Sequence, residues 1–463
     1  MSIATILWLI LAALVIGLLA VIGRVAFIAG RWVFRWGQIA AKKGNDRALL
    51  WQAQRIRRWW KRDSEILRLS QTYKREHRDG KVETIIVRPR IQVAAQPWGV
   101  RVRMATIPGV GINEVEREAQ HLADRWGAQH LVIDRLPRGT VEMRALLADQ
   151  TVLERPFDWR AFQAWELPIG HDAWGEPVGI PLPNLSGGKV TGLPGFGKSQ
   201  LLMGWGAGLS ARPEVQLAIF DGKVRTPEHG DWGIFTDRAM FLVGDDPTEA
   251  NDRLAELEEL VKVRPGLLQA ERGTHKFWTH GPTIDNPLVV VIVDEGHNYV
   301  DVGGIRNKDA KDLIESNQRR MRTLGKEGRQ FGVVLLFATQ KGTADAIPTA
   351  IRDNLEVGVC FAVSTLEAAE ASLGSGIRAD KANQPTELRD KSRYVGVCVV
   401  TGVPGLDGKY AKVRVGTIDD HDLADQIDGT QAYRRDLADL TGGTADRPDL
   451  VAVDDQDDPE AAA

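Results

Sequence analysis

The hydrophobic and polar positions of the chain fall into segments with different patterns. Residues 2–23 form an uncharged apolar run, and a helix of that length would extend ~33 Å, enough to cross the ~30 Å hydrocarbon core of a bilayer. Residues 24–63 then hold 11 Lys or Arg and 2 Asp, so the positive-inside bias places the C-terminal part in the cytoplasm. A cleaved signal peptide is the alternative, but its charges would precede the apolar run. The pattern predicts a single-pass protein of the cell membrane.

The predicted transmembrane helix occupies residues 1–24, and a basic juxtamembrane segment follows at residues 25–79. Tryptophan and arginine alternate in this segment, as they do where a protein contacts a membrane surface. A collar that contacts DNA phosphates and bases is the alternative interpretation.

Residues 80–150 combine strand-like alternation with one helical pattern. Apolar residues alternate with arginines at 98–107, which predicts a strand with one apolar and one basic face. Asn113 can cap the helix that follows, and further strands are expected at 130–134 and 140–146. The segment predicts a small α+β domain, and nothing in it indicates catalysis.

The segment 151–420 changes to short, continuous apolar runs, which are typical of buried parallel strands. These runs lie at 188–192, 215–221, 238–243, 288–293, 331–340, 357–363 and 393–400. Because helical patterns separate most of them, we expect an α/β domain. Residues 421–463 end in an acidic stretch and are predicted to be a disordered tail.

Charge and cysteine content narrow this interpretation only slightly. The formal net charge of the 463 residues is −3, but the N-terminal segment is basic and residues 446–460 hold 7 acidic residues against Arg447 alone. A near-neutral total is therefore no evidence against a polyanionic partner. Cys360 and Cys398 lie in apolar runs, and no Cys or His cluster has the spacing of metal ligands.

One motif indicates a specific chemistry. Residues 192–199 follow the P-loop pattern G-x-x-x-x-G-K-[ST] between a predicted strand and a predicted helix. In this motif glycines let main-chain N–H groups surround phosphate oxygens, Lys198 adds a charge at the β- and γ-phosphates, and Ser199 can ligate Mg²⁺. We therefore predict that the chain binds ATP and Mg²⁺. The predicted nucleotide-binding residues are Gly192, Leu193, Pro194, Gly195, Phe196, Gly197, Lys198, Ser199 and Gln200.

An acidic pair supplies the partner motif. Asp294 and Glu295 follow the apolar run 288–293, and ligands of α/β sheets bind at the carboxyl ends of the strands. Asp294 is expected to hold Mg²⁺ together with Ser199, and Glu295 to orient and deprotonate the attacking water. Gln340 ends another apolar run. If that strand separates the P-loop strand from the acidic pair, Gln340 can sense the γ-phosphate; a hydrogen-bonded strand end is the alternative. The predicted catalytic residues are Glu295, Lys198 and Gln340.

The order of these and three further motifs resembles the FtsK/SpoIIIE family. The motifs are Asp221-Gly222-Lys223, Pro247-Thr248-Glu249-Ala250, Asp294-Glu295, Gly328-Arg329 and Ala338-Thr339-Gln340. The resemblance covers about 155–415 and implies a RecA-like additional-strand P-loop NTPase core. It also implies a homo-hexamer that encircles double-stranded DNA and moves it by ATP hydrolysis, with no small-molecule substrate beyond ATP. The small domain at 80–150 resembles the DNA-channel domain of that family.

Two features of the chain differ from the family pattern or remain open. The arginine expected after an Ile-Lys-Ala-Asn segment is replaced by Gly358, so Arg329 and Arg352 are only candidates for an arginine that acts on a neighbouring subunit. Basic residues also cluster between the Asp-Glu strand and the Gln340 strand, where they form either a DNA contact or a solvated helix face. This cluster comprises Arg319, Arg320, Arg322, Lys326 and Arg329.

The single predicted span and the compact motor resemble the TraB-type plasmid-transfer proteins of actinobacterial conjugation. The resemblance therefore implies conjugative transfer of double-stranded DNA. The alternatives are a chromosome-segregation DNA pump, a type VII-like protein secretion ATPase, a coupling protein for single-stranded DNA, and a membrane scaffold with an inactive nucleotide site.

Overall fold

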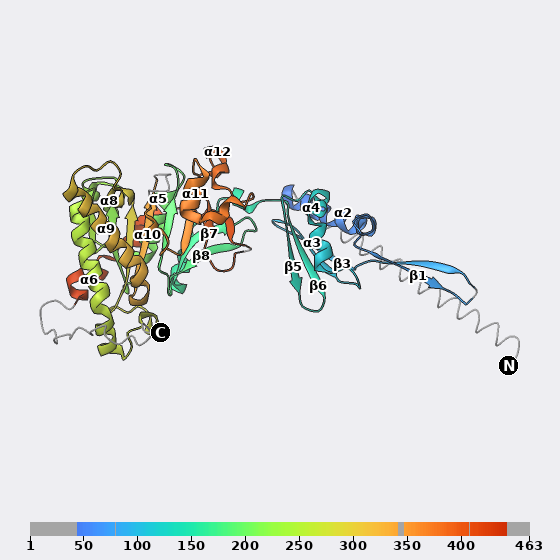
Figure 1. Cartoon of the computed structure of the whole chain (residues 1–463), viewed down its shortest axis with the longest axis horizontal. Coiled ribbons are helices and arrows are strands. Elements are labelled where there is room, and N and C mark those ends of the chain that lie inside the picture. The colour runs from blue at the N-terminus through green and yellow to red at the C-terminus, as the bar shows by residue number, and fades with distance from the viewer. Residues whose placement is uncertain (1–43, 79, 341–346, 407, 442–463) are drawn as a thin grey trace, which may run out of the picture. The chain divides into compact units, whose positions relative to one another are not determined.

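Residues 44–441 are described by a computed structural model, apart from residues 79, 341–346 and 407. The chain divides into two compact units, Met1–Gln150 and Thr151–Ala463 (Figure 1). The predicted transmembrane helix at 1–24 lies outside the described residues. Among the residues that are described, no helix is both long and apolar enough to cross a bilayer.

The first unit contains an antiparallel sheet. Within residues 91–146, four strands pair in the order β3-β4-β6-β5, and two helices connect β4 to β5. The elements of this unit are α2 (Gly44–Ile66), β1 (Gln71–Glu76), β2 (Val82–Val87), β3 (Ile91–Gln96), β4 (Gly99–Ala105), α3 (Ile112–Arg117), α4 (Ala119–Trp126), β5 (His130–Leu136) and β6 (Thr140–Leu146). Strands β1 and β2 pair with each other as a separate hairpin.

Helix α2 is part of the core of this unit. Val100 and Met104 on β4 are fully buried, and Ile56 and Trp60 of α2 pack in the same apolar cluster. The apolar face of α2 thus covers the sheet. Our border at residue 80, which assigned this helix to a juxtamembrane segment, is therefore wrong.

The start of α3 also differs from the prediction. Gly111, and not Asn113, is the N-cap residue, and its N–H donates to the Glu114 carboxylate at 2.8 Å. This hydrogen bond lowers the pKa of Glu114 and satisfies a main-chain donor at the helix end.

The second unit is built around one mixed sheet. In its described part, ten strands pair in the order β11-β10-β12-β13-β9-β14-β15-β16-β7-β8. The strands from β11 to β14 are parallel, and those from β14 to β8 pair antiparallel. The strands are β7 (Glu166–Asp172), β8 (Pro177–Pro181), β9 (Gly187–Thr191), β10 (Val215–Asp221), β11 (Phe241–Val243), β12 (Leu288–Asp294), β13 (Val333–Thr339), β14 (Val357–Cys360), β15 (Val397–Thr401) and β16 (Tyr410–Val415). The predicted α/β fold is confirmed.

Helices cover both faces of the parallel strands. On β12, Val290 and Ile292 belong to the apolar cluster on the α5 side, whereas Val289 and Val291 belong to the cluster on the side of α6 and α9, which lie next to each other (Figure 1). Because successive side chains of a strand point to opposite faces, a strand covered on both sides is apolar throughout. The helices are α5 (Lys198–Ser210), α6 (Pro247–Arg272), α7 (Phe277–His280), α8 (His297–Val300), α9 (Lys308–Glu327), α10 (Thr349–Arg352), α11 (Leu366–Leu373), α12 (Lys391–Tyr394), α13 (Asp420–Ile427) and α14 (Leu437–Leu440).

The folded chain continues beyond β16. Helix α13 buries Leu423 and Ile427, and α14 buries Leu437 and Leu440. Apolar residues three or four positions apart give each helix one buried side. The prediction of a disordered tail from residue 421 is therefore wrong up to Thr441, and the rest of that tail lies outside the described residues.

Candidate nucleotide-binding and catalytic site

The predicted site residues follow three neighbouring strands. The P-loop at 192–197 follows β9, Gln340 follows β13, and Asp294 and Glu295 lie at the end of β12. Strand β13 lies between the other two, as expected. Because parallel strands end at the same edge of a sheet, the three loops converge there.

The P-loop conformation depends on glycine. Gly192 and Gly197 have φ angles of 151° and 105°, values that residues with a Cβ rarely adopt. A Cβ on Gly192 would also lie 2.6 Å from the Cβ of Phe361. Gly197 is the N-cap of α5, so the unpaired N–H groups of the first helical turn lie beside the loop. A loop of this kind at a helix N-terminus is suited to bind phosphate.

Lys198 is the first residue of α5, and its ammonium group contacts both acidic residues. Its Nζ lies 2.9 Å from Oδ1 of Asp294 and 3.1 Å from Oε2 of Glu295, and the side chain is buried. The ammonium thus lies at the junction of the P-loop and the acidic pair. There it can exchange carboxylate oxygens for phosphate oxygens when a nucleotide binds.

Ser199 and Asp294 present oxygen ligands for a divalent cation. Ser199 Oγ lies 3.3 Å from Oδ2 of Asp294, and Lys223 Nζ lies 2.8 Å from each of these two oxygens. The Lys223 ammonium therefore places a positive charge between the two predicted metal ligands. Carboxylate oxygens are the protein ligands that Mg²⁺ prefers, and the P-loop hydroxyl is its usual companion. These residues fit the ion that we predict.

The charge state of Asp294 follows from this arrangement. Burial raises the pKa of Asp294, but the charges of Lys198 and Lys223 outweigh this effect and hold it at about 2. Burial likewise lowers the pKa of Lys223, and the charge of Asp294 outweighs it, so the net shift is upward. Asp294 is therefore an ionised carboxylate at neutral pH, as a metal ligand must be.

Glu295 is held in position from several sides. Its φ of 54° is unusual for a residue with a side chain, and such conformations persist only where the surrounding structure enforces them. Its carboxylate accepts the main-chain N–H of Gln340 at 3.2 Å and lies 3.1 Å from Nδ1 of His297. This fixed position suits a general base. The contact of Gln340 is through its main chain, so the sensing role of its side chain stays a prediction.

Three residues of this site had no role in the sequence analysis. Lys223 belongs to the Asp221-Gly222-Lys223 motif, and His297 follows Glu295 by two positions. Both residues therefore lie in or beside a motif that the sequence already showed. Trp232, whose Nε1–H donates to Oδ2 of Asp294 at 3.4 Å, lies in a short 3-10 helix (Asp231–Phe235) without any such signal.

Lys391 places a further cation beside the P-loop. Its Nζ lies 5.5 Å from the centroid of the Phe196 ring and 3.2 Å from the position that a Cβ on Gly195 would occupy. The side chain is exposed on α12, far from the P-loop in sequence. No sequence motif marks Lys391, so it was not predicted as a site residue.

The two candidate arginines lie at the amino ends of the strands, opposite the catalytic residues. Arg329 precedes β13 and Arg352 precedes β14, whereas the catalytic residues follow the carboxyl ends of the strands. Arg329 pairs with Glu356 at 2.9 Å, and Arg352 Nε lies 3.6 Å from a carboxylate oxygen of Asp353. A role in hydrolysis therefore requires a neighbouring subunit and stays a prediction.

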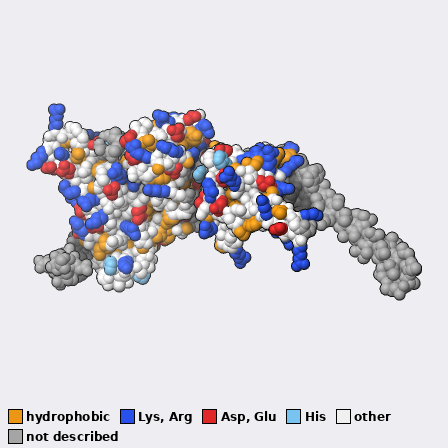
Figure 2. Space-filling view, turned by 45° about the vertical axis from the view of Figure 1, so that its right-hand side comes forward, with side chains coloured by type: hydrophobic (Ala, Val, Ile, Leu, Met, Phe, Trp, Pro, Cys, Tyr) orange, Lys and Arg blue, Asp and Glu red, His pale blue; other side chains and the backbone are white. Residues whose placement is uncertain are grey.

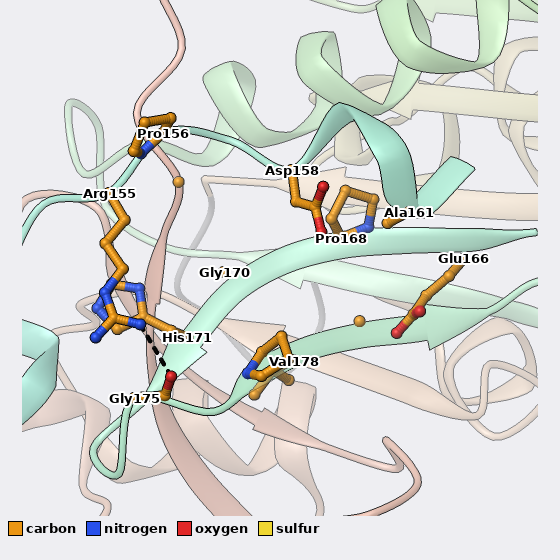
Figure 3. A pocket seen from close by; sticks show the side chains of 13 residues that line it. Arg155, Pro156, Asp158, Ala161, Glu166, Pro168, Gly170, His171, Gly175 and Val178 are labelled. Atoms are coloured by element: carbon orange, nitrogen blue, oxygen red, sulfur yellow. Dashed lines mark hydrogen bonds between the residues drawn. The ribbon is translucent and has the colours of Figure 1, made fainter. Parts of the chain in front are cut away.

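A separate hollow of about 180 Å³ lies beside β7 and β8 (Figure 3). On one side of it, Arg155 Nη1 donates to the carbonyl oxygen of Gly175 at 2.9 Å, and His171 and Glu166 contribute from β7. Its lining includes no residue of the P-loop or of the acidic pair. We assign it no part in nucleotide binding.

Comparison with known proteins supports the resemblance inferred from the motifs. No known protein-family model matches the chain. A stretch of 228 residues is 26% identical to a Staphylococcus aureus protein named DNA translocase FtsK, covering 46% of this chain and 27% of that protein. The Bacillus cereus protein of the same name is 28% identical over 225 residues, covering 45% and 26%. The resemblance to FtsK translocases is confirmed. The chain matches only about a quarter of the length of these relatives.

Solved structures give a weaker likeness. The pCW3 conjugation coupling protein TcpA, in a monomer form with ATPγS, is 15% identical with a TM-score of 0.49, over 80% of this chain and 96% of that one. The cytoplasmic domain of the Thermomonospora curvata type VII secretion ATPase EccC is 17% identical with a TM-score of 0.44, over 65% and 33%. Scores this low do not distinguish a DNA cargo from a protein cargo.

Proposed function

We propose that this chain is a membrane-anchored, ATP-driven translocase of double-stranded DNA that serves conjugative transfer. The observation that carries the proposal is the convergence of Lys198, Ser199, Asp294 and Glu295 at one edge of a parallel sheet. The similarity to proteins named DNA translocase FtsK supports DNA as the cargo. The position of β13 between β9 and β12 supports the additional-strand P-loop class that the motifs imply.

Each side chain of this site has its own role in the proposed hydrolysis of ATP. Lys198 would pair with phosphate oxygens. Ser199 and Asp294 would hold Mg²⁺, which would neutralise charge that develops on the phosphates. Glu295 orients the attacking water and accepts its proton. The main-chain N–H of Gln340 keeps the Glu295 carboxylate in place, and its side chain can respond to the γ-phosphate.

The rest of the proposal concerns assembly and location. In a homo-hexameric ring, Arg329 and Arg352 are the candidates for an arginine that acts on the site of the next subunit. A ring that contacts the phosphates of DNA does not need to recognise the base sequence. The apolar run at 2–23 would tether the ring to the cell membrane as a single span, with the two folded units in the cytoplasm.

The proposed function is tested by ATP hydrolysis of the full-length chain in detergent, with and without linear duplex DNA. We expect duplex to stimulate hydrolysis strongly and single strands to stimulate it weakly. Glu295→Gln should abolish hydrolysis and retain ATP binding, because the exchange keeps the shape of the side chain and removes the base. Hydrolysis that is indifferent to any DNA would refute the assignment of DNA as cargo and favour a protein substrate.

A further inference from the structure

Helix α9 carries a basic groove on its outer side. Ile314, Met321 and Leu324 form its buried face. Figure 2 shows one face of the molecule, on which Lys and Arg side chains are interspersed with Asp and Glu. A local excess of positive charge is therefore informative. The groove has a volume of about 430 Å³ and is lined by four basic and two acidic side chains, together with two hydroxyl residues. The charged residues are Arg319, Arg320, Arg322, Lys326, Glu258 and Glu327.

The cations of this groove are only partly neutralised. Arg320 pairs with Glu258 of α6 at 2.5 Å. Arg319, Arg322 and Lys326 are exposed, and with the residues that the structure describes they form no ion pair. Positions three or four apart on a helix share one face, so these three cations form a single stripe. The stripe is suited to an extended segment with several carboxylates.

We propose that the acidic segment 446–460 of the same chain docks in this groove. Its 7 acidic residues against Arg447 alone complement the unpaired cations. The described chain also ends against the same helix, because α14 packs on α6, which contributes Glu258 to the groove. The five residues from Thr441 to Asp446 extend up to ~17 Å, about half the circumference of a helix that is ~10–12 Å wide. The acidic segment can therefore pass around α6 and reach α9.

The groove is less suited to a duplex than to such a segment. Glu258 and Glu327 are part of its lining and would face the phosphates of any duplex that lay across it. A segment with spaced carboxylates can instead place them on the cations and pass its apolar residues over the acidic positions.

Zero-length carbodiimide crosslinking of the full-length chain, followed by mass spectrometry, tests the proposal. The reagent joins a lysine to a carboxylate with which it is in contact, so we expect Lys326 to be linked to residues 446–460. Arg319→Gln with Arg322→Gln should lower the yield roughly two- to thirtyfold, the range expected for losing two exposed charge pairs. The matched control, Lys308→Gln with Lys311→Gln at the start of the same helix, should leave it unchanged. High salt should lower it, because it screens exposed charges.

Any one of several results would overturn the proposal. The first is the absence of the Lys326 link, or an equal loss in the control variant. The second is a link between chains in a mixture of isotopically light and heavy protein, which would assign the groove to a second copy. The third is an absent link together with weaker binding of a duplex oligonucleotide by the Arg319→Gln, Arg322→Gln variant, which would make the groove a DNA contact. Lys198→Ala should lose hydrolysis and keep the link, so this test is independent of the proposed function.

Discussion

Neutralising Asp294 should destabilise the second unit before any nucleotide binds. Its carboxylate is fully buried between the ammonium groups of Lys198 and Lys223, at 2.9 and 2.8 Å. These cations hold its pKa at about 2 against an ordinary value of 3.8. Because a tenfold change in proton affinity corresponds to ~1.4 kcal/mol, the ionised form contributes on the order of 2–3 kcal/mol. Asp294→Asn keeps the shape and removes the charge, so it should cost about this much.

The sign of the pH dependence follows from the lowered pKa. A carboxylate whose pKa falls on folding contributes its full stability above the unfolded value, here near 4. The contribution is lost as the pH falls through about 2. The wild type and Asp294→Asn should therefore differ most at neutral pH and converge as the pH falls from 4 to 2.

Asp221 supplies a matched control for this prediction. It lies opposite Asp294 on β10 and is equally buried, but burial raises its pKa, so its charge is a cost. Asp221→Asn should therefore leave the stability unchanged or increase it. The assay is thermal unfolding at pH 7 without nucleotide or Mg²⁺, in which Asp294→Asn should lower Tm by roughly 3–5 °C. Equal shifts in the two variants would refute the reasoning.

Three further substitutions test other parts of the account. Gly192→Ala should abolish binding of a fluorescent ATP analogue, because its Cβ would lie 2.6 Å from that of Phe361; full affinity would contradict the described loop. Lys391→Ala should weaken the same binding about two- to fivefold and leave the turnover rate unchanged, as expected for one exposed charge. Trp60→Ala should destabilise the first unit by ~3–5 kcal/mol, measured by limited proteolysis, because the side chain is buried. Trp59→Ala, on the exposed side of the same helix, should change proteolysis little, and equal effects would contradict the packing of α2.

The parallel strands were predictable because both of their faces are buried. β12 reads as an unbroken apolar run for this reason, and β9, β10 and β13 are also fully buried. β16 was missed because its apolar residues alternate with Lys412 and Arg414. Arg414 is buried, and its guanidinium donates to the main-chain carbonyls of Arg393 and Val395 at 2.9 and 3.1 Å. A buried arginine satisfied in this way has the same appearance in a sequence as an exposed one.

The candidate site was predictable only where a local motif describes it. The P-loop and the acidic pair each lie in one short stretch, so their chemistry can be recognised from spacing alone. Trp232 and Lys391 reach the site through packing between distant segments, which no local pattern encodes. Helices α13 and α14, which follow β16, were missed for a different reason. The acidic composition of the last segment concealed the few apolar residues that these helices bury.

Displacement of a third strand from a DNA triplex measures translocation along a duplex most directly. With the full-length chain, ATP and Mg²⁺, we predict displacement that depends on a free duplex arm and that Glu295→Gln abolishes. Duplex-stimulated hydrolysis without displacement would show that the energy of ATP is not converted into movement along DNA, and would contradict the central claim.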